Sequence, residues 1–107
     1  MPTWPGMLVL GCLLAGGCFP REAQEIGSID PSSSIPAIQK AARDKDRAAI
    51  PALVKQLDSD DPAVRFYSIE ALRTLTGQTF RYRYYDDAEA RTPALKRWQQ
   101  WLAKQGR

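Results

Sequence analysis

The chain of 107 residues contains no histidine and only two cysteines, Cys12 and Cys18. Both cysteines lie close to the N-terminus, so the rest of the chain has no thiol and can form no disulfide of its own. Without histidine, the Ser-His and Cys-His pairs that activate a nucleophile cannot form. Zinc sites built from cysteine and histidine are excluded for the same reason. The composition therefore predicts a protein that is not an enzyme and binds no cofactor.

Charge is also missing at the start of the chain, where no Lys, Arg, Asp or Glu precedes Arg21. As a helix, the apolar run over residues 6–19 would be roughly 21 Å long, which is too short to span a hydrocarbon core of about 30 Å. Its length matches the apolar region of a signal peptide, and the three small residues at 15–17 are typical of a peptidase site. We therefore interpret residues 1–17 as a cleaved signal peptide.

The stretch Leu14-Ala15-Gly16-Gly17-Cys18 resembles the lipobox of bacterial lipoproteins, in which small residues precede a cysteine that is diacylated and becomes the new N-terminus. The resemblance implies a lipid on Cys18 and a chain that is exported and held at a bacterial membrane, in the cell envelope or periplasm. Two acyl chains anchor a protein firmly, whereas one anchors it only marginally. The alternative interpretation is an ordinary secretory signal with an incidental cysteine.

Residues 19–34 are rich in Pro, Ser, Gly and charge, and they contain only two isolated isoleucines, Ile26 and Ile29. Isolated apolar side chains cannot supply the face of a core, so we expect a flexible tether here. Fully extended, these roughly 16 residues would span on the order of 50 Å. The expected organisation is a signal peptide over 1–17, the lipid-attachment cysteine and tether over 18–34, and a helical domain over 35–107.

Beyond the tether, apolar residues recur at the spacing of amphipathic helices. We expect Ser34 to be the N-cap of a first helix, with Pro36 in its first turn. A third helix should begin at the Asp61-Pro62 pair and end at Gly77, the typical left-handed stop. The core-facing residues of the first helix would be Ile35, Ile38, Ala41 and Ala42. A second helix would face the core with Ile50, Leu53, Val54 and Leu57. The third helix would do so with Val64, Ser68, Ala71, Leu72 and Leu75. The sequence thus predicts an all-α fold of about four helices.

The C-terminal part is expected to contain an ordered loop and one more helix. Residues 78–90 carry several aromatics without a helical period, whereas residues 91–104 place Leu95, Trp98, Trp101 and Leu102 on one stripe. The two tryptophans are expected to close the core.

Residues 47–76 resemble a HEAT repeat of the short bacterial type. The resemblance rests on the stretches Ala49–Leu57, Asp60–Arg65 and Ala71–Leu75. In that family the two helices of a repeat pack antiparallel, and a turn Asp and a following Arg tie neighbouring repeats together. The resemblance assigns these repeat-stabilising roles to Asp61 and Arg65, and it implies a module that mediates protein–protein interaction.

Only one such repeat is evident, whereas solenoids generally need three or more units to bury a continuous face. The segments 75–80 and 98–102 resemble the C-terminal cap of small bacterial HEAT proteins. The terminal helices must therefore cap the repeat, or another molecule must stack on it, which leaves self-stacking open.

Charge is distributed unevenly along the chain. Residues 18–72 hold seven Lys and Arg against nine Asp and Glu, whereas residues 73–107 hold eight against three. The candidate binding surface is the alternating segment Arg81, Tyr82, Arg83, Tyr84 and Tyr85. Such a segment can stack on or pair with anionic lipid, polysaccharide or nucleic acid, although export disfavours nucleic acid. The alternative is that the tyrosines pack against the last helix while the arginines stay solvated.

The clustered carboxylates are interpreted as helix caps. A calcium loop needs six to eight oxygens and a distant Glu, and no Glu follows Asp58, Asp60 and Asp61 at a suitable spacing. Asp86, Asp87 and Glu89 precede the last helix, where its dipole favours negative charge. We therefore expect no metal site. The predicted function is that of a lipid-anchored envelope protein that binds an unidentified protein partner; the alternative is an accessory lipoprotein that binds anionic lipid or polysaccharide through residues 80–85.

Overall fold

The computed structural model describes residues 21–105, so the predicted signal peptide and Cys18 lie outside the described residues. The described chain is all-α, as the sequence predicts, and residues 21–105 contain no strand. Its elements are α2 (Arg21–Ile26), α3 (Pro31–Arg43), the 3-10 turn η1 (Arg47–Ala49), α4 (Ile50–Gln56), α5 (Pro62–Thr76) and α6 (Ala88–Gln105).

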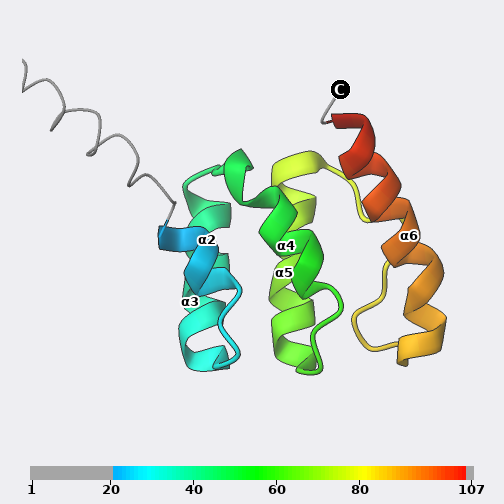
Figure 1. The fold of residues 1–107 in the computed structure, drawn as a ribbon, viewed down its shortest axis with the longest axis horizontal. Coiled ribbons are helices and arrows are strands. Elements are labelled where there is room, and N and C mark those ends of the chain that lie inside the picture. The colour runs from blue at the N-terminus through cyan, green and yellow to red at the C-terminus, as the bar shows by residue number, and fades with distance from the viewer. Residues whose placement is uncertain (1–20, 106–107) are drawn as a thin grey trace, which may run out of the picture.

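The helices form two antiparallel hairpins, α2–α3 and α4–α5, that stand side by side, followed by α6 (Figure 1). The second helices of the hairpins, α3 and α5, pack on each other, and the first helices, α2 and α4, form the other layer with α6 beyond α4. The core lies between these layers, where Ile38, Leu53, Leu57, Leu72 and Trp98 are fully buried.

The two hairpins repeat one turn motif at an offset of 31 residues. The motif is Ser-x-Asp-Pro, at residues 28–31 and again at residues 59–62. In each copy the serine hydroxyl accepts a hydrogen bond from the aspartate backbone N–H, at 3.2 Å and 3.1 Å. In each copy the aspartate carboxylate then caps the second helix, and the proline begins it. The short Asp side chain satisfies helix N–H groups that have no partner within the helix.

The same offset relates the buried residues of the two hairpins. The buried residues of α3 are Ser34, Ala37, Ile38 and Ala41, and the residues 31 positions later in α5, also buried, are Arg65, Ser68, Ile69 and Leu72. Likewise Ile26 corresponds to Leu57, and both side chains are fully buried. The chain therefore contains two repeated units, where the sequence predicted one.

The prediction for the start of the helical part is wrong at several residues. Helix α3 begins at Pro31 with Asp30 as N-cap, so Ser34 lies fully buried inside the helix and Pro36 lies beyond its first turn. Ile26, assigned to the tether, belongs to the core, and its carbonyl accepts a hydrogen bond from the Gln56 side chain at 2.5 Å. Ile29, by contrast, is 99% exposed. One isoleucine of the expected tether therefore anchors a helix that the sequence did not predict.

The predictions for the next two helices are confirmed. Residues Ile50, Leu53, Val54 and Leu57 are buried together. Helix α5 begins after the Asp61 cap and ends at Gly77, whose φ of 75° is left-handed. Glycine adopts this conformation without steric cost, because it has no Cβ.

The C-terminal loop and last helix are also present. Helix α6 begins at Ala88, three residues before the predicted start. Trp98 is fully buried, while Leu95, Trp101 and Leu102 are half-buried and pack against the core. The tryptophans therefore close the core at this end, as expected.

The first unit closes the stack at the other end. In α5, Val64 and Ala71 are buried and Tyr67 is half-buried on the side that faces the first unit. The equivalent positions of α3 hold Ser33, Pro36 and Lys40, all exposed. Terminal units of repeat proteins have such a polar outer face; self-stacking of the chain stays a prediction.

Candidate functional site

The predicted binding segment Arg81–Tyr85 lies in the loop that joins α5 to α6 (Figure 1). Side chains from two helices, α5 and α6, hold the backbone of this loop by hydrogen bonds to its carbonyls. The donors and acceptors are Arg65 Nε to Tyr84 O at 2.9 Å, Arg91 Nη1 to Asp86 O at 2.6 Å, Arg97 Nε to Phe80 O at 2.9 Å and Trp98 Nε1 to Thr79 O at 3.1 Å. Partnered carbonyls let irregular backbone lie against a core without desolvation cost, so the loop is a fixed part of the fold.

The backbone of the loop contains two residues with positive φ, Phe80 at 53° and Arg81 at 62°. Residues other than glycine rarely adopt a positive φ, and each such residue adds about 1 kcal/mol or more of backbone strain. The Phe80 ring packs edge-on against Trp98, with 4.7 Å between ring centroids. Packing and the carbonyl hydrogen bonds together offset the backbone strain.

The structure separates the five residues of the candidate surface. Tyr82 is buried, and its hydroxyl donates a hydrogen bond of 2.6 Å to Leu57 O. Burial raises the pKa of the Tyr82 hydroxyl to about 12, although Arg91 and Arg65 act in the opposite direction. Tyr82 therefore cannot contact a ligand in this fold.

The neighbouring tyrosines differ in exposure. Tyr84 is half-buried and packs edge-to-face on Phe66 of α5, at 5.1 Å between centroids. Tyr85 is 67% exposed and packs against Tyr84. Arg81 and Arg83 are exposed. Tyr82 thus bonds to Leu57 after α4 and Tyr84 packs on α5, while Arg81, Arg83 and Tyr85 remain largely on the surface.

Asp61 and Arg65, expected to tie neighbouring repeats together, form their hydrogen bonds within the second unit and to the loop that follows it. The Asp61 carboxylate accepts hydrogen bonds from the backbone N–H groups of Ala63 at 2.7 Å and Val64 at 3.3 Å. The buried Arg65 guanidinium donates to Ser59 O at 2.7 Å as well as to Tyr84 O. One arginine thereby joins the turn before α5 to the loop after it, because its planar group presents several donors in fixed directions.

Asp87, one of the carboxylates that precede α6, caps the start of that helix. The Asp87 carboxylate accepts a hydrogen bond from Ala90 N at 2.8 Å, within the first turn of α6. Across residues 21–105, no group of three or more Cys, Asp or Glu side chains is placed to hold a metal ion. None of the helices described here has the length and apolar character needed to cross a membrane.

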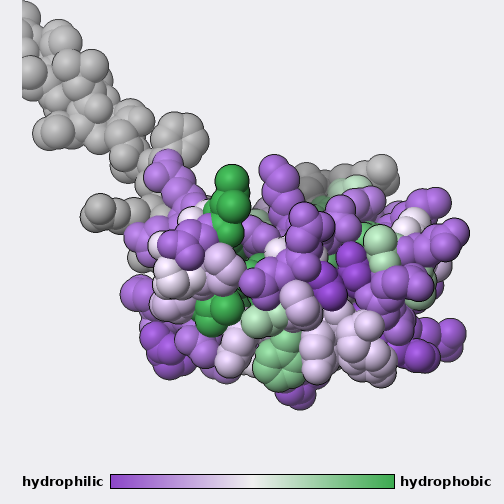
Figure 2. All heavy atoms as spheres, turned by 90° about the horizontal axis from the view of Figure 1, so that it is seen from below, coloured by the Kyte–Doolittle hydropathy of each residue, from purple (hydrophilic) through white to green (hydrophobic). Residues whose placement is uncertain are grey.

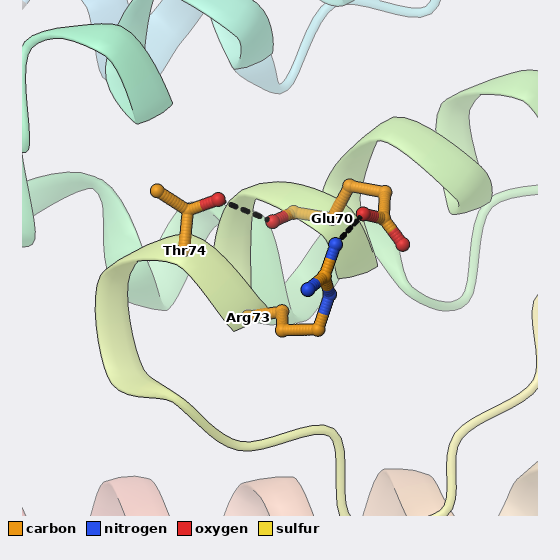
Figure 3. A network of polar contacts seen from close by, with 3 residues as sticks. All are labelled: Glu70, Arg73 and Thr74. Carbon is orange, nitrogen blue, oxygen red and sulfur yellow. Dashed lines mark hydrogen bonds and ion pairs between the residues drawn. The ribbon is translucent and has the colours of Figure 1, made fainter.

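An open groove of about 370 Å³ lies between α3 and α5. Its apolar residues are Ile38, Ala42, Tyr67 and Ala71, and its polar residues are Gln39, Arg43, Glu70 and Thr74. The polar groups on the α5 side are already engaged: Arg73 pairs with the Glu70 carboxylate, and the Thr74 hydroxyl donates to Glu70 O at 3.0 Å (Figure 3). Ile38 and Ala71 are buried, so the apolar surface of the groove that a partner can reach belongs to Ala42 and Tyr67, which are half-buried.

Comparison with known protein families, with curated proteins and with solved structures gave no match to this chain.

The groove was missed at the sequence level because only one of its two walls was recognised as part of a repeat. The signal was present: the Ser-x-Asp-Pro motif occurs twice, 31 residues apart. A helical-hairpin repeat of about this length is a known architecture. Recognition of both motifs would have predicted α3 and α5 as equivalent neighbours, with a surface formed between them.

Proposed function

We propose that this protein is a lipid-anchored, non-enzymatic component of the bacterial cell envelope whose HEAT-like module binds another protein through the groove between α3 and α5. The anchor and the export rest on the resemblance of residues 14–18 to a lipobox. The binding role is supported by one observation above all, the apolar lining of a groove between the equivalent helices of two repeated hairpins.

The chemistry of the groove favours a protein partner over a small molecule. Small-molecule sites enclose most of their ligand, whereas this groove is open and shallow along the two helices. Tyr67, half-buried on one wall, and Arg43, exposed on the other, are of the residue types that dominate binding energy at protein interfaces. A helix or extended segment with a few apolar side chains would cover the half-buried Ala42 and Tyr67.

Thr74 allows the groove to be blocked without disturbing the core. It is exposed, lines the groove and makes only a local hydrogen bond to Glu70 O at 3.0 Å. Thr92 on α6 is a matched control, since it is also exposed and donates to the carbonyl four residues earlier, also at 3.0 Å. Thr74→Arg places a long charged side chain over the apolar groove, whereas Thr92→Arg places one on the outer side of the molecule.

The test is site-specific photo-crosslinking in cells that produce the full chain, with the crosslinker at Gln39. We expect one defined adduct, reduced about fivefold or more by Thr74→Arg and unchanged by Thr92→Arg. Equal yields in the two variants, at equal protein levels, would contradict the groove as the binding surface. The same crosslinker at Lys96 on α6 should give no adduct.

The alternative function, binding of anionic lipid or polysaccharide by residues 80–85, has less support. The loop is held by the core and exposes mainly Arg81, Arg83 and Tyr85. Binding through these exposed charges would weaken steeply with salt, since they are screened beyond about 8 Å at physiological ionic strength. Apolar binding in the groove would persist at high salt.

A further inference from the structure

The three long helices α3, α5 and α6 run in the same direction, with their N-terminal ends at one end of the molecule and their C-terminal ends at the other (Figure 1). Each helix begins near an aspartate, Asp30, Asp61 or Asp87, whose carboxylate accepts from a backbone N–H of the first turn. Helix starts favour negative charge and helix ends favour positive charge. Parallel helices therefore sort the charges of this chain onto opposite ends.

The end with the helix starts, which we name the acidic end, carries Asp30, Asp58, Asp60, Asp61, Asp86, Asp87 and Glu89. Figure 2 looks onto this end and shows a mainly hydrophilic surface with isolated apolar patches. Arg65 and Arg91 also lie here, but both are buried and donate to backbone carbonyls, and two exposed basic residues, Lys55 and Arg83, lie among the more numerous carboxylates. The exposed charge at this end is predominantly negative.

The opposite end, which we name the basic end, carries Lys40, Arg43, Lys45, Arg47, Arg73 and Lys104, against Asp44, Asp46 and the Glu70 that pairs with Arg73. Two observations show that these segments meet. Arg47 donates to Leu75 O at 2.6 Å, and it shares a groove with Leu102 and Gln105 of α6. Arg43 shares the groove between α3 and α5 with Thr74.

The acidic residues cancel part of the positive charge at the basic end. Asp44 forms an ion pair with Lys40 at 2.8 Å, and this lysine lowers the pKa of the Asp44 carboxyl. Asp46 accepts a hydrogen bond from Ala48 N and caps η1. Arg43, Lys45, Arg47 and Lys104 are all exposed, so basic side chains outnumber acidic ones at this end.

The position of α2 brings the proposed anchor close to this surface. The described chain begins at Arg21, on the side of α2 that points away from the acidic end (Figure 1). Cys18 precedes Arg21 by three residues, which span at most about 11 Å. The expected tether of roughly 50 Å is therefore not available, because Ile26 is packed in the core.

We propose that the basic end lies against the anionic phospholipid headgroups of the membrane that holds the protein, with the acidic end directed away from it. This inference rests on the proposed lipid anchor at Cys18. Basic residues near an anionic membrane surface add to the attraction of an acyl anchor, and the same surface repels the acidic end. The groove between α3 and α5 would then run roughly along the membrane normal, accessible from the side.

The experiment measures which end approaches the bilayer. Two full-length variants each add one cysteine at an exposed residue of α5 or just beyond it, Ala63→Cys at the acidic end and Gln78→Cys at the basic end. The labels are separated by about 22 Å along a helix of this length. Each protein is purified from membranes, labelled with a fluorophore and reconstituted into vesicles of phosphatidylcholine with phosphatidylglycerol, with a quencher on the headgroups.

We expect quenching at position 78 to exceed quenching at position 63 several-fold, and the difference to shrink in 0.5 M salt, where the screening length is only about 4 Å. It should also shrink in pure phosphatidylcholine. Wild-type protein without an added cysteine should take up no dye, since its Cys18 is acylated in the proposed form. Dye uptake by wild type would overturn the anchor and this inference with it.

A charge-matched pair of variants locates the contact. Arg43→Gln, Lys45→Gln and Lys104→Gln together should abolish most of the difference between the two labels, because each basic residue near the surface contributes roughly fivefold in binding. The triple control Arg81→Gln, Arg83→Gln and Lys96→Gln removes the same charge elsewhere and should leave the difference intact. Equal quenching at positions 63 and 78 in an acylated protein would overturn the proposed orientation but not the anchor. Loss of the quenching difference in the triple control variant would have the same meaning.

Discussion

Arginine side chains in this protein serve the backbone more than they serve its surface. Arg47, Arg65, Arg91 and Arg97 each donate to at least one main-chain carbonyl. Arg65 and Arg91 do so from buried positions. A basic C-terminal composition therefore overstates the charge available to a ligand, because part of it closes the loop between α5 and α6.

Tyr82 provides a prediction with a pH dependence. Its folded pKa of about 12 lies above the ordinary value of 10, so the folded state holds the neutral form. Below pH 10 this tyrosine is neutral in the folded and the unfolded state, and its burial contributes fully to the free energy of unfolding. Between pH 10 and 12 the tyrosine ionises in the unfolded chain but stays neutral in the folded one, so the protein loses stability as the pH rises. Urea unfolding at pH 8 and pH 11 should show a larger loss for wild type than for Tyr82→Phe.

At pH 8 the Tyr82→Phe variant should be less stable than wild type by about 1–3 kcal/mol, since Leu57 O loses its partner in the interior. Tyr85→Phe is the control, because Tyr85 is largely exposed. It should change neither the stability at pH 8 nor the loss of stability between pH 8 and pH 11. A Tyr85 effect as large as that of Tyr82 would contradict the assignment.

Ser68 provides a prediction of the opposite sign. Its hydroxyl is fully buried and has no hydrogen-bond partner among the described residues. The equivalent residue in the first hairpin is Ala37, which shows that this position accommodates a methyl group. Ser68→Ala should therefore stabilise the fold by about 1 kcal/mol, through relief of the unsatisfied hydroxyl and the better helix propensity of alanine. A decrease in thermal stability would imply a partner for this hydroxyl.

At the scale of elements, the short helix α2 determines how much of the chain is folded. It has only six residues, and an isolated helix of that length is unstable in water. It is held through Ile26, which packs in the core, and through the hydrogen bond from Gln56 to Ile26 O. Tertiary contacts therefore stabilise a helix that local sequence preferences do not favour.

Ile26 and Ile29 form a matched pair for this point, since one is fully buried and the other is 99% exposed. Ile26→Ala should destabilise the protein by about 2–5 kcal/mol, whereas Ile29→Ala should change the free energy of unfolding by no more than about 0.5 kcal/mol. Urea denaturation of the two variants measures the difference. Two neutral substitutions would restore the flexible tether over residues 19–34.

On the scale of the whole molecule, two units and a terminal helix make a closed domain. The polar outer face of α3 ends the stack on one side, and α6 with its preceding loop ends it on the other. In the proposed function, the groove between α3 and α5 is the surface that binds a partner. The closed domain also aligns three helix dipoles, and with them the charged residues at the helix ends.

The anchor is tested by the intact mass of the protein extracted from membranes, wild type beside Cys18→Ala. Wild type should have the mass of residues 18–107 plus acyl chains, and the variant should be unprocessed or released from the membrane. An unmodified full-length wild-type chain would show that the first 17 residues are retained. The proposed localisation would then fall, while the helical fold would stand.

Much of the fold follows from local features of the sequence. The Asp61-Pro62 start and the Gly77 end of α5 were predictable because caps depend on neighbouring backbone groups. The spacing of Ile50, Leu53, Val54 and Leu57 identifies one buried face, since a helix brings these positions together whatever it packs against. The absence of histidine restricts catalytic chemistry in any fold.

Other features were decided only by tertiary contacts. Burial of Ile26 depends on a neighbouring hairpin, and burial of Tyr82 depends on the carbonyl of Leu57 from another part of the chain. The sequence of Arg81–Tyr85 predicts a binding surface, but the loop that contains this segment is held by hydrogen bonds from side chains of α5 and α6 to Tyr84 O and Phe80 O. Local sequence determines which backbone groups a residue can cap, whereas only the packed structure determines which side chains lose contact with water.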